Sequence, residues 1–162
     1  ALIGGLAIGG WTTPRTTKDI DLLVNLPETS QTFIEKEFFK NLKHAGFDGS
    51  FEVGAPKDHI RFCIKAVSPE GIPVDVIFVT RKWEEDIVKE SSLVEVFKGV
   101  FVPVAGPDGL IVMKLKAGSF QDIADASRLL AEADYDKDKL ITIAKRARVN
   151  KRLKILMERL GL

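Results

Sequence analysis

The sequence predicts an α+β fold, because three observations on its 162 residues point to that class. Short apolar runs rich in β-branched residues alternate with stretches of helical periodicity as far as residue 105. Beyond that point the hydrophobic pattern has the helical period only. Hydrophobic residues make up 45% of the chain and charged residues 29%, which is typical of a globular protein able to bury a core. We expect an α/β core over residues 1–105 and, packed on it, a helical extension over residues 106–162.

Five segments have the composition of β-strands, and turn residues separate them. The first ends at Gly4-Gly5, where we expect a tight turn, and residues 6–8 then begin a short helix that Gly9-Gly10 stops. The sequence Pro69-Glu70-Gly71 predicts an antiparallel hairpin, and Lys98-Gly99 divides a second hairpin-like segment. The expected strand segments are residues 1–3, 19–24, 60–67, 72–79 and 93–104, the last of which holds both strands of its hairpin.

Helices are predicted where apolar residues recur three or four positions apart. Ile34 and Phe38 have this spacing, Thr29 or Ser30 can cap the start of their helix, and Gly46 ends it. The other helices are expected over residues 81–90, 107–117 and 119–133, from Asp136 onward, and from Asn150 to about Gly161.

Composition excludes several classes of protein. A net charge of +1 excludes a generally basic coat for nucleic acid, although it allows a local patch. The single cysteine, Cys63, excludes a disulfide scaffold or a cysteine-based zinc site, and its apolar neighbours predict a buried strand thiol. The chain shows no signal peptide and no apolar run long enough for a membrane span, so we expect a cytoplasmic protein without a membrane partner. Because Ala1 is not Met and the chain opens directly in an apolar strand, we also expect an upstream segment.

The basic residues are concentrated at the C-terminal end. Residues 137–162 contain nine Lys or Arg and two acidic residues, which gives +7 there and leaves −6 on the other 136 residues. One interpretation is a solvated face on the terminal helices. The other is a surface that binds phosphates, for example those of RNA, although no aromatic residue interleaves with the charges.

Two acidic positions interrupt predicted strands. Asp19 and Asp21 are two residues apart in an extended run, so they share one strand face while Ile20 points the other way. Asp75 is flanked by valines in a later strand. Carboxylates in such apolar surroundings need a cation, and hard ions such as Mg²⁺ prefer these oxygens. Three carboxylates around two metals is the arrangement of two-metal phosphoryl and nucleotidyl transfer. The alternative is that Asp75 pairs with Arg61 or Arg81.

Other residues fit the same chemistry but have structural alternatives. Gly4 and Gly5 allow a backbone to approach a phosphate closely, or they form a plain turn. Arg15 either holds its loop against Asp19 or touches phosphate. Lys114 is a cation for a phosphate or a solvated lysine of an amphipathic helix.

Two acids of the helix expected over residues 119–133, and one aromatic residue, also have both a functional and a structural interpretation. Asp122 lies three residues after Ser119, the spacing of a capping box, so a role at the helix start competes with a catalytic one. Asp125 is expected to be an exposed helix acid or a salt-bridge partner. Trp11 either stacks on a base or packs against the protein.

Together these segments resemble the nucleotidyltransferase superfamily, which has a hydrophobic-Gly-Gly/Ser motif, an Asp-x-Asp strand and a third acid on a later strand. The spacing of 13 residues between Gly5 and Asp19 is similar to that of the AbiEii-like and minimal-nucleotidyltransferase branches of toxin–antitoxin systems. The helix of residues 110–117 and the Asp-containing helix after it continue the resemblance to about residue 130. Relatives usually have a helix before the Gly-Gly strand, and this chain shows none.

The resemblance implies a mixed β-sheet of the nucleotidyltransferase type with flanking helices. It implies that Asp19, Asp21 and Asp75 are catalytic and bind two Mg²⁺ ions, with Asp75 at the ion nearest the acceptor hydroxyl. Gly4 and Gly5 would contact the phosphates of a nucleoside triphosphate (NTP) through the backbone, and Lys114 and Arg15 would lie near them.

The implied activity is Mg²⁺-dependent transfer of a nucleoside monophosphate (NMP) from an NTP to a hydroxyl of RNA, of a tRNA end or of a protein. A toxin-like role with an antitoxin partner follows from the same resemblance, and a homodimer is compatible with it. Two alternatives remain, namely a non-catalytic nucleotide- or partner-binding module with this fold and a nucleotidyltransferase acting on a small molecule such as an antibiotic.

Overall fold

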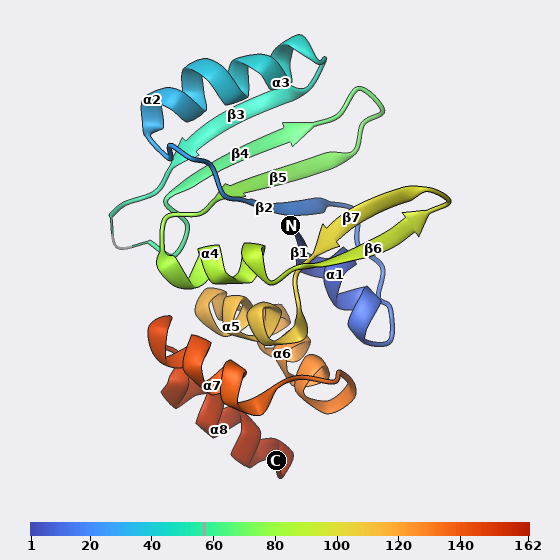
Figure 1. The fold of residues 1–162 in the computed structure, drawn as a ribbon, viewed down its shortest axis with the longest axis vertical. Coiled ribbons are helices and arrows are strands. Elements are labelled where there is room, and N and C mark those ends of the chain that lie inside the picture. Colours follow the sequence, from blue (N-terminus) through green and yellow to red (C-terminus); the bar gives the residue numbers. More distant parts are fainter. Residues whose placement is uncertain (57) are drawn as a thin grey trace.

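A computed structural model describes residues 1–56 and 58–162 and confirms the α+β class. One mixed sheet of seven strands, in the order β3-β4-β5-β2-β1-β7-β6, forms the centre, and the C-terminal helices gather on one side of it (Figure 1). The strands are β1 (Leu2–Ile3), β2 (Ile20–Val24), β3 (Asp48–Val53), β4 (Phe62–Val67), β5 (Pro73–Phe78), β6 (Ser92–Phe97) and β7 (Val100–Val104). The helices are α1 (Gly4–Trp11), α2 (Gln31–Phe33), the π-helical segment η1 (Ile34–Phe39), α3 (Lys40–His44), α4 (Lys82–Lys89), α5 (Pro107–Ala117), α6 (Phe120–Glu132), α7 (Lys137–Arg146) and α8 (Asn150–Leu160).

The pairing of the strands places β2 at the middle of the sheet. It runs parallel to β5 on one side and antiparallel to β1 on the other. The hairpins predicted from the two turn sequences are both confirmed, as β4–β5 and β6–β7. The second hairpin joins the sheet through a single pair, Leu2 with Val104, and carries exposed apolar side chains such as Phe97 and Phe101.

Alternation along the central strands divides the sheet into two chemically different faces. On β2 and β5, the residues Ile20, Leu22, Val74, Val76 and Phe78 pack in a cluster with η1 and α3. The residues between them, which include two acids, therefore face the other side of the sheet. That side is covered at one end by the C-terminal helices.

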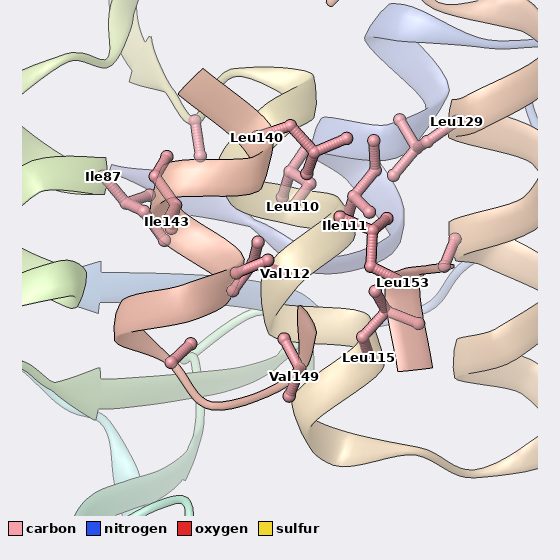
Figure 2. Close-up of a cluster of buried hydrophobic side chains, with 14 of the residues drawn as sticks. Ile87, Leu110, Ile111, Val112, Leu115, Leu129, Leu140, Ile143, Val149 and Leu153 are labelled. Carbon is pink, nitrogen blue, oxygen red and sulfur yellow. The ribbon is translucent and has the colours of Figure 1, made fainter. Parts of the chain in front are cut away.

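The C-terminal helices share one core with the sheet. Leu110, Ile111 and Leu115 of α5 are completely buried, and Ile3 and Leu23 belong to the same cluster. Figure 2 shows side chains of α4, α5, α6, α7 and α8 converging around α5. Residues 106–162 therefore pack on the sheet as a helical layer. In the part of the chain that the structure describes, no helix is long and apolar enough to cross a bilayer.

Two segments differ from the sequence-based expectations. The chain passes from β1 directly into α1 at Gly4, so the expected tight turn is wrong. The short helix expected from residues 6–8 is present, but it begins at Gly4 and continues through Gly9-Gly10 to Trp11. The glycines tolerate the helix because the sheet and α5 pack against it. Strand β3 was not predicted, because residues 48–53 are mostly exposed and begin with Asp-Gly.

Three smaller expectations are confirmed. Ser30 caps its helix by accepting a hydrogen bond from the Phe33 N–H at 3.2 Å. Cys63 is a buried strand thiol. The indole N–H of Trp11 donates to the Ala105 carbonyl at 2.9 Å, which assigns that side chain a packing role.

Candidate active site

Two of the predicted catalytic acids lie side by side on the sheet. In the parallel pairing of β2 with β5, Asp21 is directly opposite Asp75. Both belong to the face that the apolar cluster of η1 and α3 does not occupy. Asp19 lies just before β2, two residues from Asp21. The topology thus joins acids separated by more than fifty residues of chain, as the sequence analysis expected if these strands were neighbours.

Gly4 is the close neighbour of the Asp21 carboxylate. Its φ is +64°, and a Cβ added there would lie 1.8 Å from Asp21 Oδ2. The side chain of Asp21 therefore occupies the space that any other residue at position 4 would need. The backbone of Gly5 also acts to lower the pKa of Asp21 and so favours its charged form. The first turn of α1 therefore packs directly against the Asp21 carboxylate of β2.

The three carboxylates influence one another electrostatically. Burial raises the pKa of Asp21, and the charges of Asp19 and Asp75 raise it further, while Lys114 opposes them. Burial also raises the pKa of Asp75, and Asp19 adds to that rise while Lys65 opposes it. The pKa of Asp19 is lowered instead, chiefly because the Thr17 hydroxyl donates a hydrogen bond to it at 2.5 Å.

The structural alternative for Asp75 is contradicted. Arg81 bonds to Glu84 at 3.0 Å and to the carbonyls of residues 58 and 59, and Arg61 bonds to the Gly54 carbonyl. Lys65 lies opposite Asp75 on β4 but forms its ion pair with Glu52, at 3.1 Å. Within residues 1–56 and 58–162, Asp75 has no salt bridge.

A cleft of about 140 Å³ adjoins Asp21. Gly4 and Asp21 line its sheet side, and Met113, Lys114 and Lys116 line it from α5. Leu23 and Ile77 continue the lining along β2 and β5. The cleft therefore brings together three of the residues that the sequence analysis selected, Gly4, Asp21 and Lys114. Gly5, Arg15, Asp19 and Asp75 are outside its lining.

A buried ionic network lies behind the cleft. The Arg15 guanidinium donates to both oxygens of Asp125, at 3.1 and 3.0 Å. Lys114 forms ion pairs with Asp122 at 2.9 Å and with Asp125 at 3.2 Å, and Gln121 donates to Asp125 at 3.0 Å. Arg15 was expected to contact either Asp19 or a phosphate, but its side chain binds Asp125 instead.

The expected exposure of Asp125 is wrong, whereas its salt-bridge role is confirmed. The residue is 0% exposed because Arg15, Lys114 and Gln121 surround its carboxylate. Burial alone would raise the pKa of Asp125, but hydrogen bonds from these three side chains hold it below its ordinary value. No pattern in the sequence marked Asp125 as the buried centre of a network, since helix α6 also carries other acids.

Asp122 has two contacts that join the helix start to the network. Its carboxylate accepts from the Ser119 N–H at 3.0 Å, which confirms the capping box. It also accepts from Lys114 at 2.9 Å. Lys114 is therefore fixed between two acids rather than free in solvent, and only 18% of its side chain is exposed.

The chain is similar to one known protein family over most of its length. The family model described as nucleotidyl transferase AbiEii toxin, type IV toxin–antitoxin system, matches residues 1–159. The chain belongs to this family. Among curated proteins none matches. A crystal structure of an antigenic nucleotidyltransferase-like protein from Paracoccidioides brasiliensis is similar, with 18% identity and a TM-score of 0.46 over 98% of this chain and 83% of that one.

A metal site in this AbiEii-family chain is not preformed. Among the described residues, no group of three His, Cys, Asp or Glu side chains is arranged to hold an ion. The donor chemistry nevertheless suits a hard cation, because Asp21 and Asp75 are adjacent oxygen donors whose charges repel each other at a partly buried position. The metal-binding roles of Asp19, Asp21 and Asp75 stay a prediction.

Proposed function

We propose that the protein is a Mg²⁺-dependent nucleotidyltransferase that moves an NMP from an NTP to a hydroxyl acceptor, and that it acts as the toxin of a toxin–antitoxin pair. Membership of the AbiEii family supports the reaction class. The observation that carries the proposal for this chain is the register of β2 and β5, which sets Asp75 directly beside Asp21, the acid that lines the cleft.

The acids of β2 and β5 would hold the magnesium. Asp21 and Asp75 supply adjacent carboxylates, and Asp19 supplies a third that stays ionised at neutral pH because its pKa is lowered. Bound magnesium would offset the negative charge that develops on the α-phosphate and on the leaving pyrophosphate. Burial of Asp21 strengthens this interaction, since charges attract more strongly away from water.

Asp75 is also the residue we assign to proton removal from the acceptor hydroxyl. Its carboxylate lies directly beside that of Asp21 in the register of β2 and β5, where it would face the same acceptor. It is less buried than Asp21, as expected for a group that has to meet an incoming acceptor, and Lys65 on the next strand opposes the rise in its pKa.

The other half of the site would bind the triphosphate. The first N–H groups of α1, at Gly4 and Gly5, lie beside Asp21, and a helix N-terminus favours a negatively charged ligand. Lys114 lines the same cleft, and its position is fixed by Asp122 and Asp125. Arg15 would then act by holding α6 against the loop that precedes Asp19.

Transfer of label tests the proposal. Each α-³²P-labelled NTP is incubated with the protein, Mg²⁺ and one acceptor class: a tRNA pool, the protein itself or a candidate antitoxin, or aminoglycoside-like small molecules. We expect one NTP to label RNA or protein, and Asp21→Asn to abolish that label while Asp48→Asn, a change on the exposed edge strand β3, preserves it. Labelling of small molecules alone would overturn the proposed acceptor, and nucleotide binding without any transfer would indicate a non-catalytic module.

A further inference from the structure

Lys116 differs from three other charged residues that line the cleft, Lys114, Asp122 and Glu84. Asp122 is paired with Lys114, and Glu84 is paired with Arg81 at 3.0 Å. Lys116 has no ion pair within residues 1–56 and 58–162, and its Nζ donates to the backbone carbonyl of Ala147 at 2.9 Å. The cleft therefore has, on its α5 side, a half-buried lysine that forms no ion pair with any described residue.

The residues around Lys116 are cations as well. Its pKa is lowered by burial and then by the positive charges of Arg81, Arg148 and Arg152, with Glu84 opposing them. Arg152 donates to the Leu115 carbonyl at 2.8 Å, one residue before Lys116. Neither Arg148 nor Arg152 forms a salt bridge in the described part of the chain. Three cations thus lie close together beside the cleft: Lys116 lines it, Arg152 lines a neighbouring groove, and Arg148 follows Ala147, whose carbonyl Lys116 contacts. The acid that opposes their charges, Glu84, is already paired with Arg81.

Arg148 has a left-handed backbone conformation, which is strained for a residue other than glycine or asparagine. The N–H of Val149 bonds to the Ala144 carbonyl at 2.9 Å and that of Arg148 to the Lys145 carbonyl at 3.1 Å, which is the pattern of a Schellman motif after α7. Arg148 holds the left-handed position with φ +60°, where glycine or asparagine is favoured. Its exposed side chain makes no hydrogen bond within the described residues, so no contact of this side chain stabilises the fold.

We propose that Lys116, Arg148 and Arg152 form a phosphate-binding rim, which extends from the cleft past the C-terminal ends of α5 and α7 and receives the phosphate groups of a nucleotide or of an RNA strand entering the cleft. The inference rests on the proposed function, because it supplies that site with its anionic ligand. Lys116 and Arg152 also bond to the C-terminal carbonyls of α7 and α5, which fixes their direction. Arg148 is the exposed outer member, and α7 and α8 carry further basic residues beyond it.

The test measures binding without turnover. Inorganic triphosphate, by calorimetry, and a labelled single-stranded RNA oligonucleotide, by fluorescence anisotropy, are titrated into the protein and into Arg148→Asn. We expect Arg148→Asn to bind at least one probe with about tenfold lower affinity, as for the loss of one charged hydrogen bond. The salt slope for RNA should fall by about one. Because asparagine suits the left-handed position, the midpoint of thermal unfolding should equal or exceed that of the parent protein.

Lys137→Asn is the matched control, since it removes one exposed positive charge from the first turn of α7, where it lines a different groove. If Arg148→Asn binds triphosphate more weakly, the rim binds the nucleotide. If it binds only RNA more weakly, the rim binds the acceptor. Equal affinities for Arg148→Asn and Lys137→Asn, or no binding of either probe to the parent protein, would overturn the inference. Label transfer is measured on the parent protein in parallel. Binding that depends on Arg148 in a parent protein that transfers no label would refute only the proposed function.

Discussion

Replacement of Gly4 by alanine tests whether the start of α1 and the acid of β2 depend on each other. The new Cβ would lie 1.8 Å from Asp21 Oδ2, whereas ordinary contacts begin at 3.4 Å, so the carboxylate has to move by about 1.6 Å. The φ of +64° adds about 1–2 kcal/mol of backbone strain, and forcing Asp21 off its rotamer adds ~1 kcal/mol. We expect Gly4→Ala to lower the free energy of unfolding by about 2–3 kcal/mol.

The same movement should affect activity, since a displacement of ~1 Å at a catalytic group can cost about a hundredfold in rate. Urea denaturation and label transfer measure the two effects. Gly10→Ala is the control in the same helix, because a Cβ there meets nothing within 4 Å and alanine favours the helix by up to ~1 kcal/mol. If Gly4→Ala is as stable and as active as Gly10→Ala, then the described contact between Gly4 and Asp21 is wrong.

Three further predictions concern the buried groups. Asp125→Asn should cost about 3 kcal/mol in urea denaturation, because Arg15 and Lys114 lose the charge that compensates theirs; a change under ~1 kcal/mol would contradict the network. The lowered pKa of Asp125 means that its stabilisation is complete above its ordinary value of 3.8 and is lost as the pH falls through the native value. Below about pH 4 the stability of the parent protein should therefore approach that of Asp125→Asn, and a constant difference down to pH 2 would refute this. Burial raises the pKa of Cys63 to about 12, so iodoacetamide at pH 8 should label it only after unfolding in urea; rapid labelling of the native protein would show the thiol to be accessible.

Local patterns in the sequence were sufficient for most of the fold. The β4–β5 hairpin follows from its turn residues, and the helices of residues 107–160 follow from their apolar period and their capping residues. Strand β3 escaped prediction because a mostly exposed edge strand has neither strict alternation nor a buried apolar run. The short helix near residues 6–8 was predicted, but its extent from Gly4 to Trp11 was not, because four glycines oppose a helix that only tertiary packing stabilises.

The sequence predicted those residues of the candidate site that stand out as acids within an apolar strand. Asp21 and Asp75 each interrupt an apolar run, and their adjacency needed only the assumption that the two strands pair. The network of Arg15, Lys114 and Asp125 was not predictable, because each residue alone resembles an ordinary surface charge and only the packing of α6 against the first loop brings them together.

The central claim is that the carboxylates of β2 and β5 act as one catalytic unit, and a double-mutant cycle tests it most directly. Rates of label transfer are measured for the parent protein, Asp21→Asn, Asp75→Asn and the double variant at saturating Mg²⁺. Residues that act as a unit give strongly non-additive losses. We therefore predict that the double variant is about as slow as the slower single variant. Losses that add on a logarithmic scale, or a single variant that retains full activity, would contradict a shared site.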